Sequence, residues 1–247
     1  MDKSEFLTCL DTDYQRLRAV AQDAPAARVP GCPEWTMAEL VSHVAAVYLE
    51  KTETMVHGEE RPSPPDLGGA DPITALDRTY TGLVAELTAR PFTETTVTWY
   101  GPDQTVGFWV RRMAQETVIH RVDGEQAAGA TLAPIPDDLA LDGIDEVLTC
   151  FLSYGSQEYP QMFGDRLASC DGRAVLVDAG AASWSVRLAP SGVAVSNEVS
   201  DTAARVSGDP ADVLLWLWRR VDAGAVRLDG DVQLVGKLRQ LLEEATQ

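Results

Sequence analysis

The spacing of apolar residues changes about two thirds of the way along the chain. Up to about residue 154, apolar side chains recur at steps of three and four, which is the period of an amphipathic helix. This spacing predicts helices over about residues 3–22, 37–57, 72–89, 107–124 and 136–154. Beyond about residue 165, short runs rich in valine and leucine predict strands over 174–178, 183–188 and 192–196. We therefore expect the α+β class, with an N-terminal antiparallel helical bundle of four to five helices and a smaller C-terminal α+β domain.

Capping signals and helix-breaking residues mark several boundaries. Thr36 and Glu39 have the spacing of a capping box before the second helix, and Asp71-Pro72 is typical of the start of the third. Residues 58–72 contain four prolines and three glycines, which predicts a long connection. Residues 95–102 are rich in strand formers but short, so we expect an extended connection.

The last part of the chain also contains two helical patterns, over about 209–220 and 231–244. With the three predicted strands, they indicate a meandering sheet with helices packed on it. The expected domains are therefore residues 1–160, a metal-binding bundle, and residues 168–247, an α+β domain.

Charge and hydropathy exclude some classes of function. The formal net charge of -18 would repel a phosphate backbone, which argues against nucleic-acid binding. No apolar run approaches the roughly 18 residues of a membrane span, and the N-terminus lacks the basic and apolar regions of a signal peptide. We expect a cytoplasmic protein, monomeric or weakly dimeric.

The four cysteines are scattered along the chain, without a Cys-x-x-Cys pair. This spacing argues against a zinc ribbon or a dithiol redox motif and predicts free thiols that act as small packing residues. Cys32 differs in position because it lies in a loop just before a predicted helix.

A metal site is the strongest chemical candidate. Glu116 and His120 are four residues apart, so they share one face of a predicted helix with the apolar Trp109 and Met113. His43 lies at the edge of the buried face of another helix. Two imidazoles and a carboxylate around a divalent cation would satisfy one another and leave a coordination position open. On spacing alone, a solvated Glu–His pair on a helix surface is the competing interpretation.

The sequence also resembles a known family. The segment Cys32-Pro-Glu-Trp-Thr36, the run Glu-Thr-Val-Ile-His-Arg-Val-Asp over 116–123 and Leu-Asp-Gly-Ile-Asp-Glu over 141–146 are similar to the mycothiol-dependent maleylpyruvate isomerase family. The resemblance covers the whole chain. It implies a DinB-like bundle, a C-terminal domain similar to sterol carrier folds, and His43, Glu116 and His120 as zinc ligands. Their donor set also admits nickel, iron or manganese.

The resemblance implies an enzyme that uses mycothiol or a similar low-molecular-weight thiol. A metal-bound thiolate would attack a small electrophile; an isomerase then releases the thiol after rotation about a double bond, whereas an S-transferase retains the adduct. The alternative is a non-catalytic metal-binding or regulatory protein that binds a protein partner.

Four further residues are secondary candidates. Asp123 either orients His120 or forms a surface salt bridge with Arg121 or a nearby base. Arg205, Arg219 and Arg220 either receive a substrate carboxylate or belong to a solvated surface.

Overall fold

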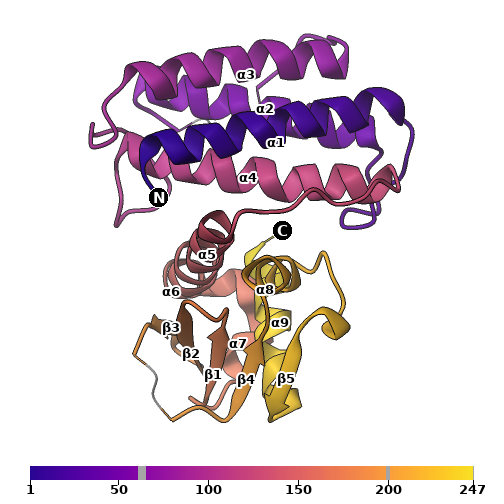
Figure 1. Ribbon diagram of the computed structural model, residues 1–247. Coiled ribbons are helices and arrows are strands. Elements are labelled where there is room, and N and C mark those ends of the chain that lie inside the picture. Colours follow the sequence, from indigo (N-terminus) through magenta and orange to yellow (C-terminus); the bar gives the residue numbers. More distant parts are fainter. Residues whose placement is uncertain (61–64, 199–200, 247) are drawn as a thin grey trace. The chain divides into compact units, whose positions relative to one another are not determined.

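Four long helices make up the first unit of the chain, Met1–Ala133, in the computed structural model, which describes residues 1–60, 65–198 and 201–246. They are α1 (Lys3–Asp23), α2 (Met37–His57), α3 (Pro72–Ala89) and α4 (Val106–Ala127). In Figure 1, α1 lies along α4 and α2 lies along α3. The predicted helical bundle is confirmed. Residues 61–64 of the predicted connection lie outside the described residues.

Side-chain caps fix where these helices begin. The predicted capping box is present at α2, where Thr36 and Glu39 each bond to the backbone N–H of the other. Asp71 caps α3 ahead of Pro72, also as predicted. Each cap satisfies backbone N–H groups that have no partner within the helix. The caps therefore fix the residue at which α2 and α3 begin, and with it which side chains face the core.

Contacts between the helices give the relative directions of α1, α2 and α4. Asp13 and Arg16 on α1 pair with Arg121 and Glu125 on α4, so these two helices run in the same direction. His43 lies by Glu116, whereas Lys51 lies over the Trp109 ring, so α2 runs opposite to α4.

Helix α4 is buried along almost its whole length. Its inward side chains include a group of polar ones: Arg112, Gln115, Thr117, His120, Arg121, Asp123 and Glu125. Because a buried polar group without a partner is costly, these side chains need one another or a ligand. Helix α4 is therefore where a functional site in this unit is expected.

The second unit, Pro134–Gln247, contains a five-stranded sheet within its described residues, in the order β3-β2-β1-β4-β5. The strands are β1 (Ala174–Asp178), β2 (Ser183–Ala189), β3 (Gly192–Ser196), β4 (Ala204–Ser207) and β5 (Arg227–Gly230). The β1, β2 and β3 strands form the predicted meander, and β4 pairs parallel to β1. The predicted α+β class is confirmed.

Helical segments complete this unit. They are α5 (Asp137–Glu146), the π-helical η1 (Val147–Tyr154), α6 (Gly155–Glu158), η2 (Pro160–Phe163), α7 (Gly164–Ala168), α8 (Pro210–Leu217), η3 (Ala223–Ala225) and α9 (Val232–Ala245). The predicted helix over 136–154 is present as α5 and η1. Helix α8 ends before the predicted residue 220 because Arg219 adopts a left-handed backbone with φ of 62°.

Two features of this unit differ from the sequence interpretation. The β4 and β5 strands were missed because they are only four residues long and β5 carries charged side chains, as edge strands often do. The compact units divide between Ala133 and Pro134, whereas the sequence suggested a division after residue 160. Helix α5 packs on α8, which places it in the second unit. The sequence suggested the first unit because the apolar residues of α5 have the same helical spacing as those of the preceding helices. Similarity of this unit to sterol carrier folds stays a prediction.

Among the described residues, the helices are too short or too polar to span a membrane.

Candidate metal centre

The three predicted ligands converge inside the first unit. His43 comes from the middle of α2, whereas Glu116 and His120 stand one turn apart on α4. One ligand atom from each residue lies within 4.8 Å of the other two. This convergence follows from the packing of α2 against α4, which brings the edge of one buried face onto the polar stripe of the other. The interpretation as a solvated surface pair does not fit His120, which is 8% exposed.

One carboxylate oxygen lies at the centre of the group. Oε1 of Glu116 is 3.2 Å from Nε2 of His120 and 3.4 Å from Nε2 of His43. Tetrahedral ligands at about 2.0–2.1 Å from zinc stand about 3.3–3.4 Å apart, so both distances match an edge of such a tetrahedron. Two of the three ligand–ligand distances therefore fit a zinc site, and the nitrogens of the two histidines lie within 4.8 Å of each other.

Exposure shows from which side the group is reached. The side chains of His120 and Glu116 are 11% and 13% exposed, whereas that of His43 is 36% exposed. The ring of Trp35, just before α2, packs against the His43 ring with the centroids 4.8 Å apart. A small ligand would therefore approach along the His43 side.

Asp123 lies behind His120. It is fully buried, and its Oδ2 is 3.0 Å from Nδ1 of His120. In the neutral imidazole this contact favours the proton on Nδ1, so that Nε2, which faces Glu116, is the nitrogen that a metal would bind. Of the two roles considered for Asp123, the structure places it in the one that orients His120, whereas Arg121 is buried and bonds to other carboxylates.

The contact between Arg112 and Glu116 was not predicted from the sequence. Nη2 of Arg112 donates to Oε2 of Glu116, whereas the two histidines contact Oε1. The spacing of four residues between Arg112 and Glu116 was a usable signal, since such pairs share a helix face. For Trp35 no spacing signal existed, because it belongs to a loop that only the fold brings to His43.

Electrostatics in the group favour a charged pair when no metal is present. Burial by itself would raise the pKa of Glu116, but His120 and Arg112 hold it well below its usual range. Burial would lower the pKa of His120, but Glu116 and Asp123 raise it to about 9. A metal ion that binds Nε2 of His120 must therefore displace a proton.

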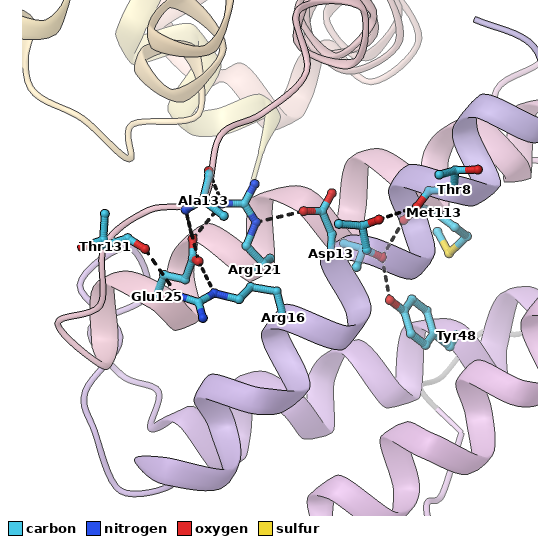
Figure 2. Close-up of polar contacts among 11 residues, drawn as sticks. Thr8, Asp13, Arg16, Tyr48, Met113, Arg121, Glu125, Thr131 and Ala133 are labelled. Carbon is cyan, nitrogen blue, oxygen red and sulfur yellow. Dashed lines mark hydrogen bonds and ion pairs between the residues drawn. The ribbon is translucent and has the colours of Figure 1, made fainter.

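A second polar cluster holds α4 against α1 (Figure 2). Nε of Arg121 donates to Asp13 at 2.9 Å, and its Nη1 donates to Glu125 at 2.7 Å and to the carbonyl of Ala133 at 2.8 Å. Arg16 bonds to the other oxygen of Glu125 at 2.6 Å. Arg121 follows His120 directly but points toward α1, so this cluster fixes the helix that carries the ligands.

The remaining candidates lie elsewhere. All four cysteines are free thiols, as predicted; Cys150 and Cys170 are buried, and Cys9 and Cys32 are partly exposed. Arg205 pairs with Asp178, and Nη1 of Arg219 donates to Leu242 and Thr246. Nη1 of Arg220 donates to the carbonyl of Trp218. These contacts hold the arginines within their own unit, and a role in binding substrate stays a prediction.

Comparisons with solved structures identify the same fold in two crystal structures of a mycothiol-dependent maleylpyruvate isomerase. A histidine-to-alanine mutant of that protein aligns with a TM-score of 0.63 and 14% identity, covering 94% of this chain and 95% of that chain. The unmutated protein aligns with a TM-score of 0.62 and 15% identity over the same shares. A search of curated proteins found no match.

Family models account for most of the sequence. The mycothiol maleylpyruvate isomerase N-terminal domain matches residues 9–124, which include the three predicted ligands, and the C-terminal domain of the same family matches residues 138–237. The chain therefore belongs to the mycothiol-dependent maleylpyruvate isomerase family.

Proposed function

We propose that this protein is a thiol-dependent isomerase of a small electrophile, and that its reaction uses a zinc ion held by His43, Glu116 and His120. The observation that carries the proposal is the position of Oε1 of Glu116, 3.2 Å and 3.4 Å from Nε2 of the two histidines. Membership of the family supports the thiol and the isomerisation, and the three converging side chains support the metal.

The donor set fits the metal. Two imidazole nitrogens and one carboxylate oxygen are a common set of protein ligands at catalytic zinc sites, which keep a further position for water or substrate. Nickel, iron and manganese accept the same donors and remain alternatives to zinc. A bound zinc ion would lower the pKa of a thiol and hold it as a thiolate beside the electrophile.

Neighbouring residues orient the side chains that carry these donor atoms. Asp123 accepts a hydrogen bond from Nδ1 of His120 and so directs Nε2 toward the site. Trp35 packs on His43, which limits the rotation of the most exposed ligand. Because the other two ligands are nearly covered, the thiol and the electrophile would enter beside His43.

We propose mycothiol as the thiol and maleylpyruvate as the first electrophile to test, because the family and the two aligned structures are named for them. An S-transferase would use the same site, and the products of the reaction distinguish the two activities. The proposed compartment is the cytoplasm, where low-molecular-weight thiols are kept reduced.

The test compares three proteins: wild type, His43→Ala and His57→Ala. His57 is exposed at the end of α2 and serves as a matched control for loss of a histidine. Each is assayed with zinc, mycothiol and maleylpyruvate. We expect His43→Ala to lose at least about a hundredfold in isomerisation rate, the upper end of the loss seen for residues behind a metal ligand, while His57→Ala keeps the wild-type rate.

Equal rates for wild type and His43→Ala would contradict the enzymatic proposal. A protein partner that stays bound to the wild type after zinc is removed with a chelator would instead favour the non-catalytic binding protein.

A further inference from the structure

The two oxygens of Glu116 have different partners. Oε1 faces the two histidine Nε2 atoms, at 3.2 Å and 3.4 Å. Oε2 accepts a hydrogen bond from Nη2 of Arg112, one turn earlier on α4. The Arg112 side chain is 6% exposed, so little water competes with this ion pair.

A carboxylate held in this way offers a metal one oxygen. To bind through both oxygens, Glu116 would have to turn Oε2 toward the ion, and the charge-assisted bond to Arg112, which is among the stronger hydrogen bonds in proteins, restrains that oxygen. A guanidinium stays charged at any working pH, so the bond persists under all conditions of assay.

We propose that Arg112 is a positioning residue that makes Glu116 a one-oxygen ligand and thereby keeps a coordination position open for the thiol. This inference rests on the proposed function, because it presupposes that His43, Glu116 and His120 hold a metal. With Arg112 in place, the ion has three protein donors and room for a sulfur. Without it, Oε2 takes the fourth position, and the thiol must displace it.

Charge in the site supports the same role. A divalent cation with Glu116 and Arg112 leaves a local charge of about +2, which the buried Asp123 reduces to about +1. An incoming thiolate would neutralise that charge. Replacing Arg112 by a neutral residue removes one positive charge as well as the restraint on Glu116, so both effects weaken thiolate binding.

The test uses cobalt(II) as a spectroscopic replacement for zinc. Four-coordinate cobalt(II) absorbs visible light strongly, whereas five- and six-coordinate cobalt(II) absorbs weakly. A bound thiolate adds a charge-transfer band in the near ultraviolet. Each protein is loaded with cobalt(II) alone and then titrated with 2-mercaptoethanol. The variants are Arg112→Met, Arg112→Lys, which keeps a charged donor, and Arg111→Met, a control at the neighbouring position.

For Arg112→Met we expect a weaker thiolate charge-transfer band than in wild type at equal thiol concentration, because Oε2 of Glu116 competes with the sulfur for the ion. We also expect thiol binding about tenfold to hundredfold weaker, the range typical for residues that support a metal ligand. Arg112→Lys is expected to lie close to wild type, and Arg111→Met to match it. If Arg112→Met fails to fold, Arg112→Gln takes its place with the same expected direction.

Two results separate this inference from the proposed function. A wild type that binds no cobalt(II) would contradict the metal site itself. A wild type that binds cobalt(II) and the thiol, with Arg112→Met identical to it in spectrum and thiol affinity, would overturn the role of Arg112 while leaving the metal site intact.

Discussion

Oδ2 of Asp123 lies 3.0 Å from Nδ1 of His120, and both residues belong to the last two turns of α4. The carboxylate is fully buried, so the contact is shielded from water. Because Asp123 holds one ring nitrogen, the other nitrogen of His120 is directed at Glu116 whether or not a metal is bound.

Replacing Asp123 by asparagine should therefore weaken metal binding. We expect the Kd for zinc to rise about tenfold to hundredfold, because the neutral amide supports the ligating imidazole less well. Competition with a chromophoric chelator measures this Kd. Asp138→Asn removes an equal charge from an exposed position on α5 and should leave the Kd unchanged. Equal zinc affinity in Asp123→Asn and wild type would show that Asp123 does not support His120.

Asp13 should make stability depend on pH. Burial raises the pKa of this carboxyl to about 6, although Arg121 opposes the shift. A carboxyl with a raised pKa in the folded state contributes stability that is complete below pH about 4 and is lost as the pH rises through about 6. In Asp13→Asn that titration is absent.

The free energy of unfolding of wild type minus that of Asp13→Asn is therefore expected to fall between pH 4 and pH 7. The fall is at most about 3 kcal/mol, from roughly two pKa units at about 1.4 kcal/mol each. Urea unfolding at several pH values measures the difference. A difference that stays constant with pH would mean that Arg121 balances burial at Asp13, and one that rises would mean that Arg121 outweighs it.

Gly230 should be intolerant of any side chain. It closes β5 with φ of 78°, and a Cβ there would lie 2.5 Å from the carbonyl oxygen of Ala203. The left-handed backbone alone costs an L-residue about 1–2 kcal/mol. We expect Gly230→Ala to lower the free energy of unfolding by about 2 kcal/mol or more.

Gly236 provides the matched control in the same unit. It lies within α9, and a Cβ there would meet nothing within 4 Å. Gly236→Ala should raise the free energy of unfolding by about 0.5–1 kcal/mol because alanine loses less backbone entropy in a helix. Thermal or urea unfolding compares the two variants, and a similar effect of both substitutions would contradict the structural account of Gly230.

Much of the fold followed from local patterns. The helix periods and caps predicted α1 to α4 within a few residues, because Thr36, Asp71 and the apolar spacing act over one or two turns. The β4 and β5 strands could not be found in this way, since they pair with β1 and with each other across long stretches of sequence. The end of α8 depends on the left-handed backbone of Arg219, which no propensity predicts for an arginine.

The candidate site divides in the same way. Glu116, His120 and Asp123 share one helix, so their spacing indicated that they lie together. The family resemblance supported the addition of His43 from another helix. The contact between Trp35 and His43 depends on the path of a loop, and the bond from Arg112 selects one oxygen of Glu116, a detail that spacing does not specify.

The zinc content of the purified protein tests the central claim most directly. Wild type, His57→Ala and His120→Ala are dialysed against buffer with one equivalent of zinc and analysed by elemental mass spectrometry. We predict about one zinc ion per chain in wild type and His57→Ala, and almost none in His120→Ala, because removal of one nitrogen donor leaves only two protein ligands. Equal zinc content in His120→Ala and wild type, or none in any of the three, would contradict a metal centre at His43, Glu116 and His120.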